Sequence, residues 1–214
     1  MKKKVLVEGP ILTQSGYGEH ARFVMRALRT QEDKFDIYAV PLNWGQTSWI
    51  FEDNEERKWL DSIINKTVLF LQNQNQFDIY LHVGIPPEFK KKAPISISIN
   101  ASIETDRVQA EWIDILNREC DKVITISEHS KSVFEKTKYK VKDQFGNVHD
   151  LKLNVPVEIA NYPVRKFNKF DDHKKWFSLD YDFNFLCIAQ WGPRKNLEST
   201  IKWFIDPTEQ YIKN

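Results

Sequence analysis

The chain has 214 residues, of which 41% are hydrophobic and 13% aromatic, enough for one complete domain and part of another. Its 31 basic and 30 acidic residues give a formal net charge of +1, which argues against a nucleic-acid binder that depends on a broad basic surface. No apolar run reaches the roughly 18 residues of a membrane span, and the run after the basic start MKKK is too short for a signal peptide. A cytoplasmic protein without an integral membrane segment is therefore expected.

Two further features of the composition bear on redox state and partners. Cys120 and Cys187 are far apart and lie in apolar surroundings, which predicts buried thiols and neither a disulfide nor a zinc site. Lysines gather at residues 90–92 and between residues 131 and 142. They allow peripheral contact with an anionic membrane, although a solvated surface is the favoured interpretation.

The first elements predict the opening unit of a parallel α/β sheet. The apolar run Val5–Val7 is followed by the small-residue loop Ser15, Gly16, Tyr17 and Gly18. Apolar residues then recur at helical spacing, at Ala21, Val24, Met25 and Leu28. Such a loop lets a ligand approach bare backbone at the start of a helix, but a turn that needs two glycines for its geometry alone is the alternative.

The same alternation continues along the chain. Strands are expected at residues 35–40, 77–83, 95–99, 122–126 and 157–160. Helices are expected from Glu55, capped by Asp53, and at residues 109–118 and 129–136, the last capped at Ser127–Glu128; residues 66–76 fit either helix or strand. Trp44 and Trp49 lie in a long loop, where they either form platforms for a ligand or anchor the loop to the core. The fold class predicted is α/β, a doubly wound Rossmann-like parallel sheet.

The remaining segments predict additions to this sheet. Residues 139–153 are expected to form a β-hairpin insertion. After the first domain, residues 1–164, the charged and aromatic segment 165–181 is predicted to be a linker. Residues 182–214 would begin a second domain that is incomplete, with a strand at 183–189 and a helix at 196–204.

Candidate site residues lie in loops that would share one sheet edge, because parallel strands end on the same side. Glu104 and Asp106 follow the strand at 95–99 and suit general acid/base or hydroxyl-binding roles, or else form an acidic pair at a helix start. His82 ends another strand and faces the same cleft, although a packed histidine is the more ordinary interpretation. Arg194 and Lys195 precede a helix and predict a diphosphate site. No metal-binding motif is present.

Three motifs in this order resemble the retaining glycosyltransferases of the GT-B fold, the group called glycosyl transferases group 1. They are GPILTQSGYGEHARFVMRAL, ETDRVQAEWIDILNRECDKVITISEHSKSVF and WGPRKNLESTIKWF. The resemblance covers most of the chain and implies that residues 1–164 form the acceptor-side Rossmann-like domain of that fold. Residues 182–214 would then begin the donor-side domain.

The resemblance also implies an activity and roles for the candidate residues. It implies metal-independent transfer of a sugar from a nucleotide-sugar donor, a substrate and not a cofactor, to a saccharide, lipid or protein acceptor, with retention at the anomeric carbon. Arg194 and Lys195 would neutralise the leaving diphosphate, with Gly16, Tyr17 and Gly18 lining the cleft near the donor phosphates and acceptor. Glu104 and Asp106 would approach the acceptor or the transferred sugar as the catalytic pair, with His82 and Ser15 in the cleft.

The sequence departs from the family pattern in two places. Many relatives carry a histidine in the loop that here reads NASIETD, and the acidic E-x7-E element that grips the donor is absent. A truncated enzyme, or a second chain that supplies the missing domain, is therefore expected. A non-catalytic remnant is the alternative. A nicotinamide-dependent oxidoreductase is disfavoured, because Pro41, Leu42 and Asn43 follow the second strand where an acidic residue would bind a ribose.

Overall fold

The computed structural model describes residues 2–73, 75–142, 144–164, 181–189 and 191–206. The chain divides into two compact units, Met1–Arg165 and Lys166–Asn214, and each is described by itself. The predicted linker, residues 165–181, lies outside the described residues except for Tyr181.

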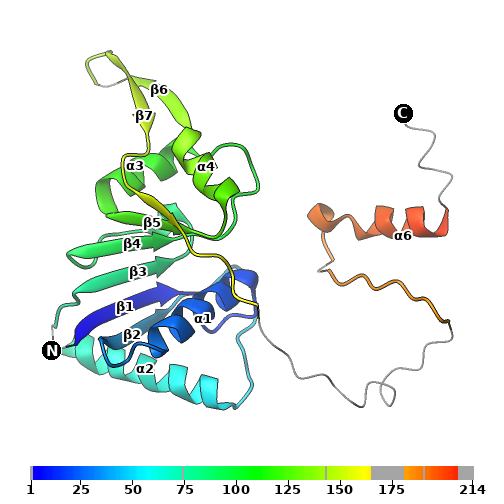
Figure 1. Ribbon diagram of the computed structural model, residues 1–214, viewed down its shortest axis with the longest axis horizontal. Coiled ribbons are helices and arrows are strands. Elements are labelled where there is room, and N and C mark those ends of the chain that lie inside the picture. The colour runs from blue at the N-terminus through cyan, green and yellow to red at the C-terminus, as the bar shows by residue number, and fades with distance from the viewer. Residues whose placement is uncertain (1, 74, 143, 165–180, 190, 207–214) are drawn as a thin grey trace. The chain divides into compact units, whose positions relative to one another are not determined.

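The first unit is built on a six-stranded parallel sheet with the strand order β2-β1-β3-β4-β5-β8 (Figure 1). The strands are β1 Lys3–Gly9, β2 Phe35–Pro41, β3 Ile79–Val83, β4 Ile95–Ile99, β5 Lys122–Thr125 and β8 Val157–Ile159. Each matches a strand expected from its apolar and β-branched run, because a strand buried on both faces has little place for polar residues. The prediction of an α/β fold with a Rossmann-like parallel sheet is confirmed.

Four helices connect the strands of this unit. They are α1 Gly16–Arg29, α2 Glu55–Gln72, α3 Ala110–Glu119 and α4 Glu128–Lys136, with a short 3-10 turn, η1 Pro86–Glu88. The ambiguous segment is helical as far as Gln72. Ser127 caps α4 as predicted, accepting a hydrogen bond from the Ser130 N–H at 3.1 Å. The predicted cap Asp53 is wrong. Asn54 directly precedes α2, and its side chain accepts from the Arg57 N–H at 2.9 Å.

Alternate residues of the strands supply two hydrophobic cores, one on each face of the sheet. On one face, Val5 and Val7 pack with Ala21 and Met25 of α1. On the other face, Tyr80 packs with buried side chains of α3 and α4, namely Ile113, Leu116, Val133 and Phe134. Helices on both faces are what a buried parallel sheet requires.

The helix α2 covers the open edge of the sheet at β2. The side chain of Thr67 accepts a hydrogen bond from the Ala39 N–H at 2.8 Å and donates to the Ile63 carbonyl at 2.7 Å. Leu60 and Ile63 pack in the same core as Ile37 and Ala39 of β2, so apolar contacts also hold α2 against the edge strand. A side-chain hydroxyl here takes the place of a neighbouring strand and blocks edge-to-edge pairing.

The predicted hairpin is confirmed and stands away from the sheet (Figure 1). Its antiparallel strands are β6 Lys138–Lys142 and β7 Val148–Lys152, and Gly146 occupies the left-handed region at the turn with φ 84°. Its base is anchored by the Tyr139 hydroxyl, which donates to the Val108 carbonyl at 2.6 Å, and by the Asn117 side chain, which donates to the Lys152 carbonyl.

The second unit contains a short 3-10 turn, η2 Pro193–Lys195, and the helix α6 Leu197–Ile205, as the helical spacing predicted. The predicted strand at residues 183–189 is wrong, because this segment pairs with no strand among the described residues. Phe185 instead meets Phe204 of α6, with ring centroids 5.0 Å apart. The prediction that both cysteines are buried fails here for the same reason. Cys120 is buried in the first unit, whereas Cys187 is exposed.

Candidate functional site

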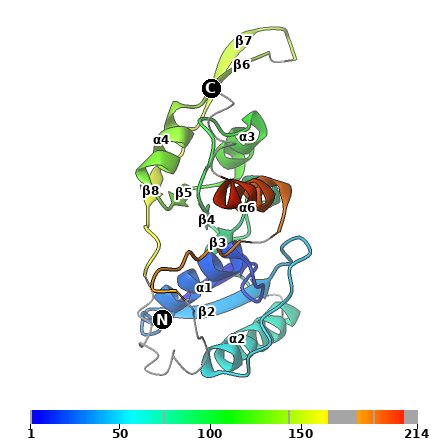
Figure 2. The same ribbon diagram turned by 90° about the vertical axis from the view of Figure 1, so that its right-hand side faces the viewer.

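The sheet has a switch point between β1 and β3, where chain connections lead to opposite sides. The first connection runs from β1 to β2, whereas every later strand is added beyond β3. Open α/β sheets bind ligands outside the carboxyl ends of the strands at such a point. Figure 2 looks onto this edge, where Gly9 ends β1 and Val83 ends β3. We call the ends of β1, β3 and β4 with their following loops the carboxyl edge.

The loop after β1 begins α1 at this edge with an ordered cap. The Ser15 hydroxyl accepts from the Gly18 N–H at 2.9 Å and pairs with the Thr13 hydroxyl at 2.7 Å. The Ser15 carbonyl accepts from the Glu19 N–H at 2.9 Å. A first helical turn leaves its leading N–H groups without helical partners, and in α1 these belong to Gly16 and Tyr17. An anion or a water molecule can accept from them.

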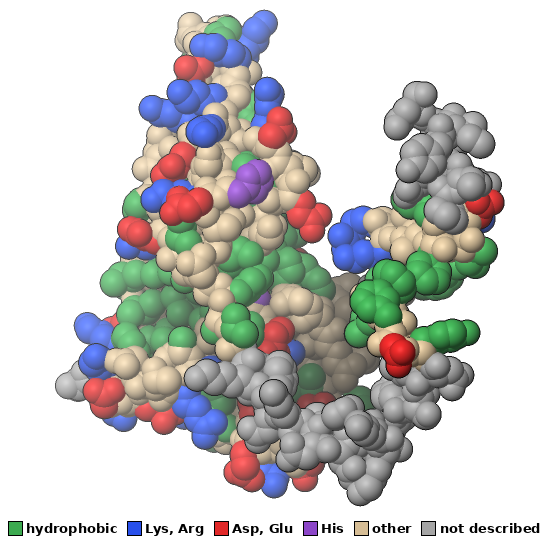
Figure 3. Space-filling view, turned by 45° about the vertical axis from the view of Figure 1, so that its right-hand side comes forward, with side chains coloured by type: hydrophobic (Ala, Val, Ile, Leu, Met, Phe, Trp, Pro, Cys, Tyr) green, Lys and Arg blue, Asp and Glu red, His purple; other side chains and the backbone are tan. Residues whose placement is uncertain are grey.

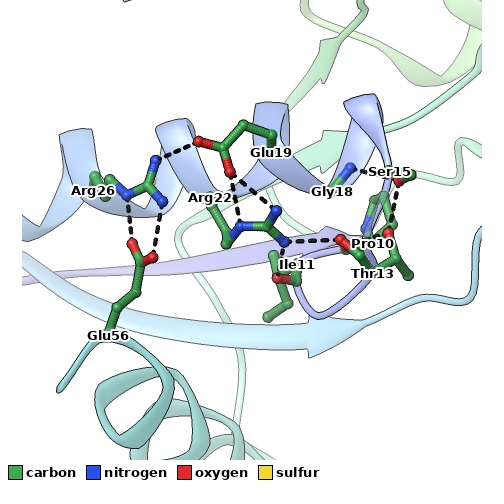
Figure 4. Close-up of polar contacts among 9 residues, drawn as sticks. All are labelled: Pro10, Ile11, Thr13, Ser15, Gly18, Glu19, Arg22, Arg26 and Glu56. Atoms are coloured by element: carbon green, nitrogen blue, oxygen red, sulfur yellow. Dashed lines mark hydrogen bonds and ion pairs between the residues drawn. The ribbon is translucent and has the colours of Figure 1, made fainter. Parts of the chain in front are cut away.

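Arg22 holds the loop in place from within (Figure 4). Its guanidinium donates to the Ile11 carbonyl at 3.0 Å and to the Thr13 carbonyl at 2.9 Å, and it pairs with Glu19 at 3.0 Å. Glu19 also bonds Arg26, which is in turn paired with Glu56 of α2. Charge-assisted hydrogen bonds from Arg22 to backbone carbonyls therefore hold the loop in place. The sequence pattern did not predict these bonds.

The two glycines of the loop differ in the space that surrounds them. A Cβ on Gly18 would lie 2.1 Å from the Thr13 carbonyl oxygen, so that position accepts no side chain in this backbone. A Cβ on Gly16 would meet nothing within 4 Å. The geometry-only interpretation thus accounts for Gly18 but not for Gly16, whose bare backbone faces open space.

Tyr17 reaches from the start of α1 across the carboxyl edge. Its ring stacks on Trp44, with centroids 4.0 Å apart, so this tryptophan anchors a loop residue. The backbone of Ala101, just after β4, hydrogen-bonds the hydroxyl, and Tyr162 and Glu88 are near enough to act on it electrostatically. Burial raises the pKa of Tyr17 to about 12, so the phenol is a neutral hydrogen-bonding group near pH 7.

A cluster of charged side chains gathers around Glu8, near the end of β1. The Tyr80 hydroxyl donates to the Glu8 carboxylate, and the Lys92 ammonium bridges both oxygens of that carboxylate at 2.6 and 2.7 Å. Glu88 lines the same hollow of about 260 Å3 as Glu8, Asn43 and Lys92. Burial, and then the charge of Glu8, raise the pKa of Glu88. A carboxyl group at an open edge with a raised pKa can exchange a proton with a bound hydroxyl.

The sequence-predicted cleft residue His82 lies beneath this edge and is fully buried. Its ring packs edge-on against Phe89, with centroids 5.7 Å apart, and a Cβ on Gly84 would lie 2.7 Å from its Cε1. The Glu88 carboxylate is 3.9 Å from Nε2. Burial lowers the pKa of His82 to about 4, so the imidazole is neutral at pH 7. This environment is that of a packed residue, with Glu88 between it and the hollow.

Glu104 and Asp106 lie on an exposed loop that is tied to α4. The Ile103 N–H donates to the Ser130 hydroxyl at 3.0 Å, and the Val108 N–H donates to the Thr137 hydroxyl at 3.3 Å. Since α3 begins only at Ala110, neither carboxylate is in its first turn, and the helix-start interpretation is wrong. Glu104 lines a hollow with Ser102, Arg107 and Trp112. Their catalytic role stays a prediction.

Arg194 and Lys195 occupy the η2 turn of the second unit, and both are exposed. The residue that follows, Asn196, has a left-handed backbone with φ 47° and begins α6 without a side-chain cap. The two cations therefore stand next to a helix start whose N–H groups carry no capping side chain. Their role toward a diphosphate stays a prediction.

Sequence reasoning missed Glu88, Glu8 and Arg22 as parts of the edge. Glu8 belongs to a strand that is otherwise mostly apolar, and Glu88 follows two prolines that predict a turn but no function. One signal was present in the sequence. A charged residue within an otherwise apolar strand, as Glu8 is, needs a partner when buried.

Comparisons with protein-family models, with curated proteins and with solved structures found no match to this chain. Among the described residues, no three His, Cys, Asp or Glu side chains are grouped to hold a metal ion. None of the helices in the described ranges is long and apolar enough to cross a bilayer.

Proposed function

We propose that this chain is the acceptor-side part, with the start of the donor-side part, of a retaining glycosyltransferase of the GT-B fold. Its reaction would move a sugar from a nucleotide-sugar donor to an acceptor without a required metal. The resemblance in three ordered motifs suggests this reaction. The observation that carries it furthest is a small-residue loop, with bare backbone at Gly16, at the switch point of a Rossmann-like sheet.

The groups at the carboxyl edge suit the handling of a hydroxylated acceptor. The neutral Tyr17 phenol donates or accepts a hydrogen bond, and the Glu88 carboxyl, with its raised pKa, is suited to proton exchange. The N–H groups that lead α1 favour a partly negative oxygen. In this proposal Glu104 and Asp106 approach the acceptor or the transferred sugar, as the resemblance implies.

The second unit supplies the proposed donor contacts. Arg194 and Lys195 would stabilise the charge that develops on the leaving diphosphate, which accelerates the reaction more than binding of the ground state does. Loss of one charge-assisted contact costs about 1.5–3 kcal/mol, a factor of roughly ten to a hundred.

Ligand-observed NMR with a panel of nucleotide sugars tests the proposal on the full chain, together with an assay for release of nucleoside diphosphate. We expect saturation transfer to at least one donor and a roughly tenfold or larger loss of its affinity in Arg194→Ala. Lys202→Ala removes an exposed cation of the same unit and serves as the control. Absence of binding to every donor, or equal affinity in Arg194→Ala and the control, refutes the proposal that this chain supplies donor contacts through Arg194 and Lys195.

A titration with NADH separates the proposal from the oxidoreductase alternative. The second strand ends at Pro41 and continues into Leu42 and Asn43, so no carboxylate stands at its end to hold a ribose. We expect no saturable quenching of NADH fluorescence, and tight binding of NADH would favour the oxidoreductase.

A further inference from the structure

An apolar groove of about 480 Å3 lies between α1 and the sheet, away from the charged cluster of the carboxyl edge. Val24 and Leu28 of α1 form one wall, and Leu81 and Ile99 of the sheet form the floor. The segment after β8, residues 160–163, closes the other side. Figure 3 shows hydrophobic side chains gathered in a band across the middle of the first unit.

The groove exists because α1 covers only part of its face of the sheet. Ile95 of β4 is 49% exposed, and Ile97 and Ile124 on the same face are only half-buried. Parallel sheets normally bury both faces, so an uncovered apolar stretch of this kind is characteristic of a binding surface.

A buried histidine in the groove lacks the partners that a stable polar group requires. His20 of α1 lines the groove and is 5% exposed, and neither ring nitrogen has a hydrogen-bond partner among the described residues. Tyr162 meets its ring edge-on, with centroids 4.9 Å apart, and is itself 42% exposed. Rotation of this exposed tyrosine would open His20 to the groove. Buried polar groups without partners are costly, and in native proteins they usually have a functional reason.

The state of His20 defines what it can recognise. Burial lowers its pKa to about 4, so at pH 7 the neutral imidazole carries one N–H donor and one acceptor nitrogen. A ligand with a hydroxyl or amine N–H can satisfy the acceptor nitrogen, whereas a purely apolar side chain cannot.

We propose that this groove binds a small, largely apolar molecule that carries one hydroxyl or amine hydrogen-bond donor, which His20 accepts. A volume of about 480 Å3 with mostly apolar walls and a few polar groups, His20 among them, matches the usual form of a small-molecule site. An apolar face of a protein helix would fill the groove but leave the imidazole unpaired, so a small molecule is the better fit. The proposal does not depend on sugar transfer.

Two fluorescent probes of nearly equal shape test the hydrogen bond. N-phenyl-1-naphthylamine has one N–H donor, and 1-phenylnaphthalene has none. We expect both to bind the full chain, with the amine binding about five- to tenfold more tightly, as one buried hydrogen bond predicts. In His20→Phe the amine should lose this advantage, while binding of the hydrocarbon is retained.

A second pair of variants locates the binding. Ala27 lies exposed on α1 at the groove, so Ala27→Trp should fill it and abolish binding of both probes without disturbing the core. Val68→Trp places the same side chain on an exposed position of α2 and should leave binding unchanged. Circular dichroism and thermal unfolding confirm that each variant is folded.

Three results would overturn the proposal. One is the absence of saturable probe binding by the wild-type chain. Another is an equal affinity for amine and hydrocarbon in the wild-type chain. The third is a self-association, seen by sedimentation velocity, that Ala27→Trp abolishes, because a second copy would then be the occupant of the groove.

Discussion

Two buried imidazoles should make this fold sensitive to mild acid. His82 is fully buried and His20 is 5% exposed, and burial lowers the pKa of each from 6.5 to about 4. Between about pH 4 and pH 6.5 the two histidines are largely protonated in the unfolded chain but stay neutral in the folded chain. The stability that the neutral rings allow is therefore complete above about pH 6.5 and is lost as the pH falls toward 4.

The expected loss is large compared with ordinary stabilities. A pKa of about 4 in the folded state against 6.5 in the unfolded state costs about 2 kcal/mol per imidazole between pH 7 and pH 5, because each pH unit between the two values is worth about 1.4 kcal/mol. Both histidines together give about 4 kcal/mol. Domains are commonly stable by only about 5–15 kcal/mol, so urea unfolding should shift markedly.

Urea titrations at pH 7 and pH 5, followed by circular dichroism, measure this difference in wild type and three variants. His82→Leu and His20→Phe should each remove about half of the acid-induced loss and be nearly neutral at pH 7, since the replaced nitrogens have no partners among the described residues. His129→Leu alters an exposed histidine and should keep the full loss. If His82→Leu and His20→Phe each lose as much stability between pH 7 and pH 5 as the wild type does, the two imidazoles are not the cause.

Other substitutions test the bracing of the glycine loop and of the sheet edge. Gly18→Ala should cost about 1–3 kcal/mol by urea unfolding, because its Cβ would overlap a backbone carbonyl, whereas Gly16→Ala should change stability by less than about 1 kcal/mol. Equal costs would contradict this assignment. Arg22→Met should cost about 3 kcal/mol and raise amide exchange in residues 11–15, since two carbonyls lose charged donors. Thr67→Val should cost about 1–2 kcal/mol by exposing the β2 edge, and an unchanged stability would refute this role.

The sheet could be predicted from sequence because its determinants are local. Each strand is a short apolar run, and β1, β2 and β3 end at or just before a glycine or a proline. Ser127 marks the start of α4 as an N-cap residue should. Parallel strands end on one side of a sheet, which also predicted that the loop Ser15–Gly18 lies at the carboxyl edge. The cap of α2 was predicted one residue too early, because Asp53 and Asn54 are adjacent and both are good N-cap residues.

The charged cluster at the carboxyl edge could not be predicted, because its members are distant in the chain. Glu8 meets Tyr80 and Lys92 across separations of 72 and 84 residues, and the contacts depend on strand order and register. The strand expected at residues 183–189 failed for a related reason. The apolar sequence FNFLCIA favours a strand, but a strand needs a neighbouring strand for its backbone hydrogen bonds. Among the described residues this segment pairs with none.

The separation of the two loop glycines changes what the sequence motif means. In the sequence, a glycine that is needed for packing looks the same as a glycine that lets a ligand approach the backbone. Only the contacts in the structure distinguish the two. Gly18 is accounted for by the chain itself, since the Thr13 carbonyl occupies the place of its side chain. Gly16 has no such neighbour, and it begins α1 beside the neutral phenol of Tyr17. The case for a ligand at this loop therefore depends on Gly16, and a Gly16 variant that keeps its stability but loses donor or acceptor binding would establish it.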